Sequence, residues 1–191
     1  MTGAERTMRE RMLAGEPYVV DESLAADARR CRLLLHRINT ATPDQDDERD
    51  ACLRELLGSF GEGSNIRPPF HCDYGFQLHL GERVFANFGF TALDVARITI
   101  GDDTQIGSAV QLLTPTHPLE PDRRREGWEG GEPITIGRNV WLGGAVVVCP
   151  GVTVGDDTVV GAGSVVIHDL PSGVLAVGNP ARIVRSIAES S

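Results

Sequence analysis

A branched aliphatic residue occurs at every sixth position over one long stretch of this chain. The same spacing occurs over a shorter stretch before it, and glycine often follows the aliphatic residue. The positions are Ile136, Leu142, Val148, Val154, Val160 and Val166, and earlier Ile100, Ile106 and Leu112. A fixed short period is typical of a solenoid, in which each repeat buries its apolar side chain against the neighbouring repeats.

A period of six residues favours a β-helix among the solenoids, because coiled coils and helical repeats have longer periods. Three hexapeptides, each a short strand and a tight turn, would form one triangular coil. We expect the recurring aliphatic residue to point into the prism, where burial stabilises the fold by about 1.5–3 kcal/mol for each side chain. Turn-forming residues lie at 101–103, 138–139 and 155–157. The sequence therefore predicts a mainly β solenoid, since a β-sandwich does not need so regular a spacing.

The composition excludes several classes of function. A net charge of −9 argues against nucleic acid as a partner. No apolar run is long enough to span a membrane, and Met1–Glu10 is polar, so neither a membrane partner nor a secretory signal is expected. The four cysteines form no CxxC pair, which argues against a zinc site and a disulfide framework and favours a cytoplasmic location. They are Cys31, Cys52, Cys72 and Cys149.

The chain divides into regions of different pattern. Residues 1–60 predict an N-terminal α-helical cap, with one apolar stripe of helical spacing and a second helix at about 44–57. The stripe consists of Leu24, Ala28, Cys31, Leu35 and Ile38. Residues 61–185 predict the β-helix, and 186–191 a polar tail.

One long polar segment, the loop 114–133, interrupts the hexapeptide spacing. His117 stands near its start, next to Pro118, which restricts the backbone. Long loops that leave a regular scaffold often carry function. We therefore interpret His117 as a candidate catalytic residue, with a tolerated insertion and a solvent-exposed histidine as the alternatives.

Several motifs resemble those of a known family. The segment 65–185 is similar to the hexapeptide-repeat acyltransferases, which fold as a left-handed parallel β-helix, and within them to the maltose and galactoside O-acetyltransferases. The motifs are PPFHCDYG at 68–75, FANF at 85–88, THP at 116–118, PITIGRNVWLG at 133–143, PGVTVGD at 150–156 and GNPAR at 178–182. The segment MLAGEPY at 12–18 resembles the helical cap of the same subgroup.

The resemblance implies an acetyl-CoA-dependent O-acetyltransferase that acts on a sugar or another small hydroxylated acceptor. His117 would be the general base, and a neutral imidazole suits this role because its usual pKa is about 6.5. The hydroxyl would attack the thioester directly, without an acyl-enzyme. Asn87 would bond the acceptor or the acetyl group.

The resemblance also implies the remaining site residues, a homotrimer with active sites between neighbouring prisms, and no metal. The acceptor-binding candidates are Asp73, Asp94, Glu129 and Asp21. The CoA-binding candidates are Trp141, Gly144, Ala162, Ile167, His168, Arg182 and Arg185.

Some positions depart from the family pattern and leave the acceptor open. Cys149 replaces a residue that is often polar, Ile167-His168 replaces a Thr-Lys pair, and Val95 replaces a second aspartate of the galactoside subgroup. The alternatives are an N-acetyltransferase for an amino sugar or antibiotic, and a non-catalytic β-helix assembly protein. A zinc hydratase like the γ-class carbonic anhydrases would need three imidazoles, and no closely spaced histidine pair is present.

Overall fold

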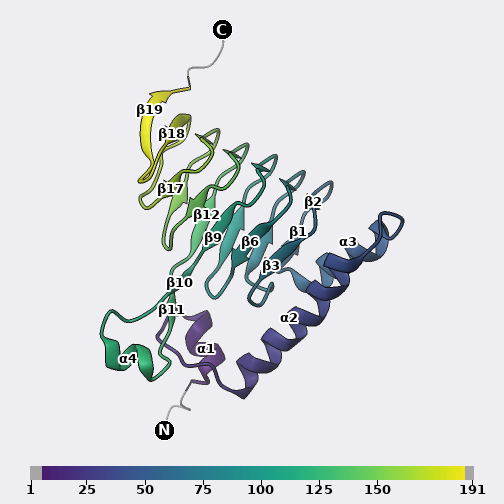
Figure 1. Cartoon of the computed structure of the whole chain (residues 1–191), viewed down its shortest axis with the longest axis vertical. Helices are drawn as coiled ribbons and strands as arrows, with labels where there is room; N and C mark the ends of the chain where they lie inside the picture. The colour runs from purple at the N-terminus through teal and green to yellow at the C-terminus, as the bar shows by residue number, and fades with distance from the viewer. Residues whose placement is uncertain (1–5, 188–191) are drawn as a thin grey trace.

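The structure is a computed structural model that describes residues 6–187. Its main body is a column of stacked coils built from three parallel sheets (Figure 1). The first sheet contains β1 (Ser59–Phe60), β4 (Leu78–Leu80), β7 (Ile98–Ile100), β12 (Ile134–Ile136) and β15 (Thr153–Val154). The third contains β3 (Phe70–Cys72), β6 (Phe90–Leu93), β9 (Gln111–Leu113), β14 (Val147–Val148) and β17 (Val165–Val166).

The second sheet is longer and ends in an antiparallel hairpin. It contains β2 (Asn65–Ile66), β5 (Phe85–Ala86), β8 (Gln105–Ile106), β13 (Trp141–Leu142), β16 (Val159–Val160), β18 (Val174–Val177) and β19 (Arg182–Ser186). The strands β18 and β19 form the hairpin. Of the predicted tail, Ser186 belongs to β19, and residues 188–191 lie outside the described residues.

The recurring aliphatic residues stack inside the column. Ile136 pairs in register with Ile100 below it and with Val154 above it, and all three are buried. The equivalent residues of the other two sheets stack in the same way. The predicted inward orientation is therefore confirmed, as are the mainly β class and the parallel β-helix with helices at its N-terminal end.

The first coils are longer than the later ones. Phe60 pairs with Leu80, 20 positions further along the chain, whereas Leu142 pairs with Val160, 18 positions further along. The two extra residues lie between the third sheet and the first, because the other two connections keep the hexapeptide spacing. This connection is called the third corner below.

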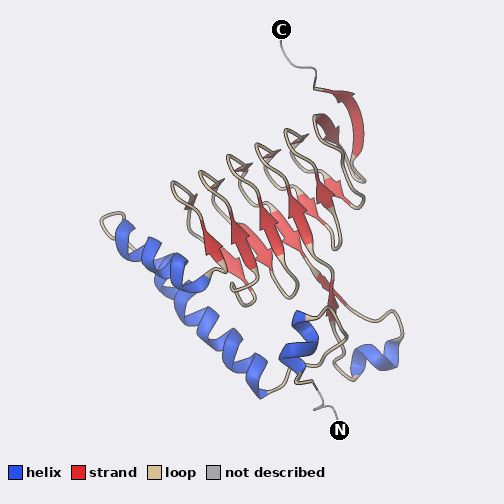
Figure 2. Cartoon of the chain, turned by 180° about the vertical axis from the view of Figure 1, so that it is seen from behind, coloured by secondary structure: helices blue, strands red, loops and turns tan. Residues whose placement is uncertain are grey.

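The cap consists of α1 (Met8–Leu13), α2 (Glu22–Thr40) and α3 (Asp46–Leu56). Figure 2 shows α2 and α3 against the first coil, where α2 contacts β3 and α3 contacts β1. Four of the five stripe residues on α2 are buried, and Ala28 is half-buried. The helices cover the end of the column, where unpaired strands would otherwise be exposed. No described helix has the length and apolar character needed to cross a bilayer.

The interrupting loop has a structure of its own. It leaves the third corner as β10 (Pro115–Thr116), forms the short α4 (Pro121–Arg125) and returns as β11 (Gly130–Gly131). The strands β10 and β11 pair antiparallel, so the two ends of the loop lie together. Figure 1 shows the loop beside α1, below the coils.

Candidate active site

The third corner brings three of the predicted site residues to one edge of the prism. Asp73 follows β3, Asp94 follows β6 and His117 follows β10, in three successive coils. Asp73 and Asp94 thus meet because each directly follows a strand of the third sheet, and His117 joins them because the loop leaves this corner just after β9 of that sheet.

A pocket of about 330 Å³ lies at this edge, between the coils, the loop and α2. Two carboxylates and one imidazole, those of Asp73, Glu129 and His117, line it together with apolar side chains. The apolar part consists of Val20, Ala28, Tyr74, Leu93, Val95 and Pro115. A pocket of this kind can hold a small polar molecule and bind its hydroxyl groups.

His117 is exposed at this pocket, directly after β10. Among residues 6–187, no protein group is hydrogen-bonded to its ring. A ring nitrogen is therefore accessible to a hydroxyl group in the pocket. Pro115 and Pro118 hold the backbone on both sides, which limits the positions the ring can take.

Asp73 is half-buried, and its environment favours the protonated form. Burial, the nearby charge of Asp94 and that of Glu129 together raise the pKa of Asp73 to about 6. The carboxyl group thus changes its charge close to neutral pH and can both donate and accept hydrogen bonds.

Asp94 does not line the pocket, because it lies behind the wall with an exposed fraction of 0%. One carboxylate oxygen accepts the backbone N–H groups of Asp73 (3.1 Å) and Tyr74 (2.9 Å), and the other accepts that of Gln77 (3.1 Å). Burial raises the pKa of Asp94, and these hydrogen bonds oppose the rise. The expected direct contact with an acceptor does not fit this position, since Asp94 holds the corner that carries Asp73.

Glu129 belongs to the returning part of the loop and is held from the cap. The phenol of Tyr18 donates a hydrogen bond of 3.0 Å to its Oε2.

Asp21, which was expected to bind the acceptor, has a structural role instead. Its carboxylate caps α2 by accepting the N–H of Leu24 (3.0 Å), and its neighbour Val20 lines the pocket instead.

The remaining predicted residues lie elsewhere on the column. Asn87, Gly144 and Ala162 lie at the connection between the second and third sheets, which is called the second corner below. The backbones of successive coils lie close together at this corner, since a Cβ on Gly143 would lie 2.6 Å from the backbone nitrogen of Ala162. Within one chain, the structure does not bring Asn87 and His117 together.

The proposed CoA-binding side chains extend along the later coils. Trp141 lies on β13 with 57% of its surface exposed. Arg182 and Arg185 lie on the exposed β19 and form no ion pair with any of residues 6–187. Ile167 and His168 follow β17, at the third corner, towards the C-terminal end of the column.

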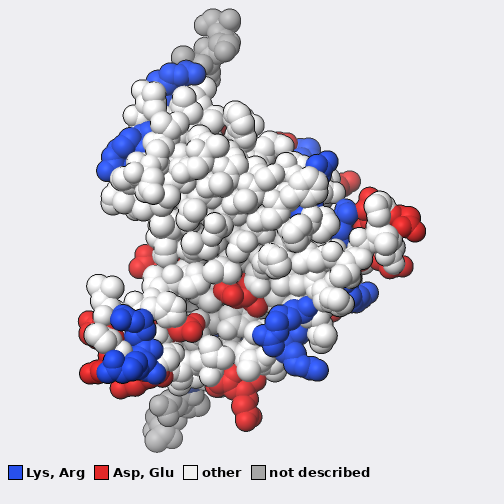
Figure 3. Space-filling view, viewed as in Figure 1, with Lys and Arg blue, Asp and Glu red and all other residues white. Residues whose placement is uncertain are grey.

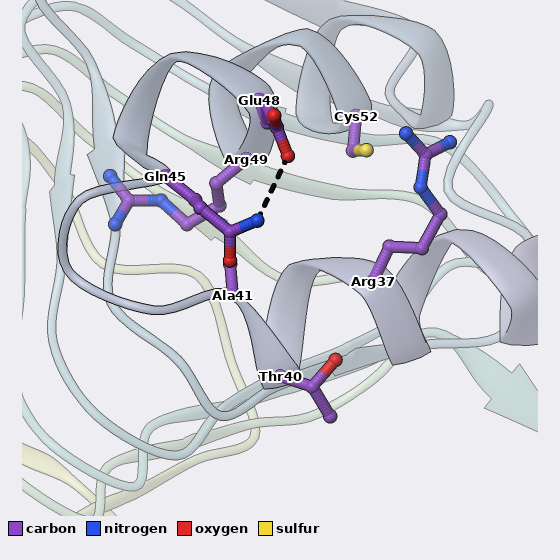
Figure 4. Close-up of a pocket in the computed structure, with 7 residues that line it drawn as sticks. All are labelled: Arg37, Thr40, Ala41, Gln45, Glu48, Arg49 and Cys52. Atoms are coloured by element: carbon purple, nitrogen blue, oxygen red, sulfur yellow. Dashed lines mark hydrogen bonds between the residues drawn. The ribbon is translucent and has the colours of Figure 1, made fainter.

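A second hollow, of about 210 Å³, lies between α2 and α3 and contains none of the predicted residues. Figure 4 shows Arg37 and Arg49 extending to opposite sides of it, while Gln45 and Glu48 are joined by a hydrogen bond of 3.1 Å. Its cationic groups do not converge on one point, so it is not the candidate site. Among residues 6–187, no group of three or more His, Cys, Asp or Glu side chains could hold a metal ion.

The sequence did not single out Tyr18 and Tyr74 as parts of this region. Both lie inside motifs that were recognised, at 12–18 and 68–75, but neither has a spacing that indicates a contact with the loop. Their role becomes visible only when the cap and the third corner are placed together.

The chain matches two family models. Residues 11–61 match the maltose acetyltransferase hexapeptide capping motif, and residues 133–168 match the bacterial transferase hexapeptide with six repeats. Nodulation protein L of Rhizobium meliloti (strain 1021) is 48% identical over 93% of this chain and 98% of that protein.

Solved structures of high similarity cover nearly the whole chain. A maltose O-acetyltransferase from Clostridium difficile 630 has a TM-score of 0.95 at 42% identity, covering 96% of this chain and 99% of that one. A galactoside acetyltransferase in complex with coenzyme A has a TM-score of 0.92 at 37% identity, covering 97% of this chain and 93% of that one.

Proposed function

Because the chain belongs to the hexapeptide-repeat acyltransferases, within their maltose and galactoside O-acetyltransferase subgroup, we propose that it acetylates a hydroxyl group of a sugar or another small acceptor, with His117 as general base. It is an acetyltransferase, and acetyl-CoA is its donor. A non-catalytic assembly role is therefore set aside.

The observation that carries the proposal is the exposed imidazole of His117 in one pocket with two carboxylates. A hydroxyl group is a poor nucleophile until a base takes its proton. In the proposed reaction the imidazole takes this proton while the acceptor oxygen attacks the thioester carbonyl, and the imidazolium then protonates the departing CoA thiolate. General-base catalysis of this kind contributes about 10²–10⁴-fold to the rate.

The acceptor would be bound by the two carboxyl groups of the pocket. Asp73 and Glu129 can form hydrogen bonds with neighbouring hydroxyl groups of a sugar. The apolar side chains of Leu93 and Val95 would contact its less polar face. An amine is the alternative acceptor, and comparing a glycoside with its amino analogue decides between O- and N-acetylation.

The separation of Asn87 from His117 supports a site shared between copies. We propose a homotrimer in which the second corner of one copy adjoins the third corner of the next. Two large apolar side chains near the second corner, Phe88 and Trp141, are more than half exposed in the single chain. Figure 3 shows that the middle of the coils facing the viewer carries few charged groups, whereas such groups lie around it, over the cap, over α4 and over the C-terminal hairpin.

In this arrangement CoA would lie along the second corner. The small residues Gly144 and Ala162 leave the backbone open to the pantetheine arm, and Trp141 stands beside it. Arg182 and Arg185 would pair with its phosphate groups. Ile167 and His168 lie at the third corner, so in the proposed trimer they would approach CoA from the neighbouring copy. We also propose a cytoplasmic location, because the cysteines of the described residues are free thiols.

The test is the variant His117→Ala, measured as acetyl transfer to a panel of glycosides and as CoA affinity. Transfer should fall by about 100-fold or more while CoA affinity persists. His71→Ala is the matched control, because His71 is exposed on β3 and lies outside the pocket. If turnover of His117→Ala stays within about threefold of wild type, the assigned base is wrong.

A further inference from the structure

Tyr18 is a buried polar side chain that the proposed chemistry does not use. It is the bulkiest of the fully buried side chains, with 1% of its surface exposed. It packs with Met12, Leu24, Tyr74 and Val95 in a small apolar cluster between the cap and the third corner. A phenylalanine would fill the same space, so packing alone does not account for the phenol.

The phenol and the backbone of Tyr18 both bind Glu129. The side chain donates to Oε2 at 3.0 Å. The backbone N–H of Tyr18 donates to the carbonyl of Glu129 at 3.0 Å, and the N–H of Glu129 donates back at 2.9 Å. These three hydrogen bonds join a cap residue to the loop across 111 positions of sequence.

In the hydrogen bond between the side chains of Tyr18 and Glu129, the phenol is the donor and the carboxylate is the acceptor. Burial first, and then the nearby carboxylate of Glu129, raise the pKa of Tyr18 well above its ordinary value. The phenol therefore keeps its proton and acts as the donor. One carboxylate oxygen of Glu129 is occupied by this bond, and the other has no hydrogen-bond partner among residues 6–187.

We propose that Tyr18 is a positioning residue for the acceptor: it holds Glu129 so that the second carboxylate oxygen faces a hydroxyl group of the acceptor beside His117. This inference rests on the proposed function and extends the acceptor site into the cap. Tyr18 itself does not line the pocket, so it acts only through Glu129.

The loop has a second anchor next to Glu129, which makes the inference testable with a small change. The ring of Trp128 contacts two guanidinium groups, that of Arg11 at 5.5 Å from the ring centre and that of Arg123 at 4.8 Å. Together with the two backbone bonds, this contact should keep the loop in place when the phenol oxygen is removed. Tyr18→Phe therefore isolates the side-chain bond.

The experiment compares wild type, Tyr18→Phe, Glu129→Ala and the double variant, with separate kcat and KM values for each substrate. Tyr18→Phe should raise the acceptor KM about 5- to 20-fold, with kcat within about threefold and an unchanged KM for acetyl-CoA. The double variant should be no worse than Glu129→Ala, because alanine offers the phenol no acceptor oxygen and the group on which Tyr18 acts is then absent. Met12→Leu changes packing in the same cluster without touching the bond, and should leave the acceptor KM unchanged.

Additive effects in the double variant, or an unchanged acceptor KM in Tyr18→Phe, would overturn the inference. Crystal structures of wild type and Tyr18→Phe give a reading that needs no turnover. The Glu129 carboxylate should rotate away from its wild-type position in the variant, and an unmoved carboxylate counts against the role of Tyr18. If the wild-type protein acetylates no glycoside of the panel, the proposed function fails, and these two structures still decide whether Tyr18 positions Glu129.

Discussion

At the scale of single residues, Asp73 links the acceptor pocket to the stability of the fold. Its pKa is raised from 3.8 to about 6 in the folded protein, so the folded state binds a proton more tightly than the unfolded chain does. The contribution of Asp73 to the free energy of unfolding therefore falls as the pH rises from about 4 to about 6. The cause is the removal of Asp73 from water, close to two other carboxylates.

Replacing this carboxyl group should remove that dependence. We expect Asp73→Asn to be more stable than wild type by about 1–3 kcal/mol at pH 8, and to show no gain below about pH 4. Urea unfolding between these pH values measures the difference. Asp47→Asn, which removes an exposed carboxylate from α3, is the control and should show no such gain. If the free energies of unfolding of Asp73→Asn and wild type differ by the same amount at every pH, folding does not raise the pKa of Asp73.

Asp94 stabilises the fold, whereas the ionised carboxylate of Asp73 destabilises it. The carboxylate of Asp94 accepts hydrogen bonds from three backbone N–H groups at the third corner. Asp94→Ala would leave these donors without a partner in a buried place, and we expect a loss of about 3–5 kcal/mol of stability. Asp94→Asn keeps one acceptor oxygen and should lose less. The order of the two melting temperatures is the measurement, and equal values would argue against the structural role.

The family resemblance indicated His117, Asp73 and Glu129 as candidates, and all three line one pocket. It did not distinguish residues that line the pocket from residues that support its wall. Asp94 and Asp21 carry the same carboxyl group as Asp73. Nothing in their spacing indicates that Asp94 is buried or that Asp21 caps a helix. That distinction depends on which face of the corner each side chain occupies. Likewise, Tyr18 lies 111 positions from Glu129, and no local pattern indicates the bond.

At the scale of elements, the coil length explains where the pocket forms. The hexapeptide spacing holds along the first two connections of each coil, and the third corner carries two extra residues in the early coils and the whole loop in a later one. Those additions move the backbone away from the compact turn and make room for a cavity. In the sequence the same additions make the spacing look irregular before Ile98, so the early coils could be predicted only in outline.

The inward positions of the regular coils lead to a sharper prediction. Ile136 and Thr135 are neighbours on β12, the first buried and the second exposed. Ile136→Asp should prevent folding or lower the melting temperature severely, because an unpaired carboxylate inside the prism costs several kcal/mol, about the whole stability of many domains. Thr135→Asp places the same group on the outer face and should change the melting temperature only slightly. Equal effects of the two variants would contradict the inward orientation.

At the scale of the whole molecule, the proposed machinery is divided between two edges of one prism. His117 and the acceptor carboxylates occupy the third corner, whereas Asn87 and the small residues Gly144 and Ala162 occupy the second. A rigid column cannot bring these edges together by bending. If both groups take part in the reaction, as we propose, a complete site needs a second copy, and a closed ring of copies would supply each third corner with the second corner of its neighbour.

Mixing two inactive variants tests this division directly. His117→Ala and Asn87→Ala should each have little activity alone, because every site in their trimers lacks one group. When equal amounts are unfolded and refolded together, random assembly should restore about a quarter of wild-type activity, since most trimers then contain both variants and each of these has one complete site. Sedimentation of the refolded mixture gives the number of copies. A trimer that stays inactive after mixing would place both residues in the site of a single chain, and a monomer with full wild-type activity would remove the need for a shared site.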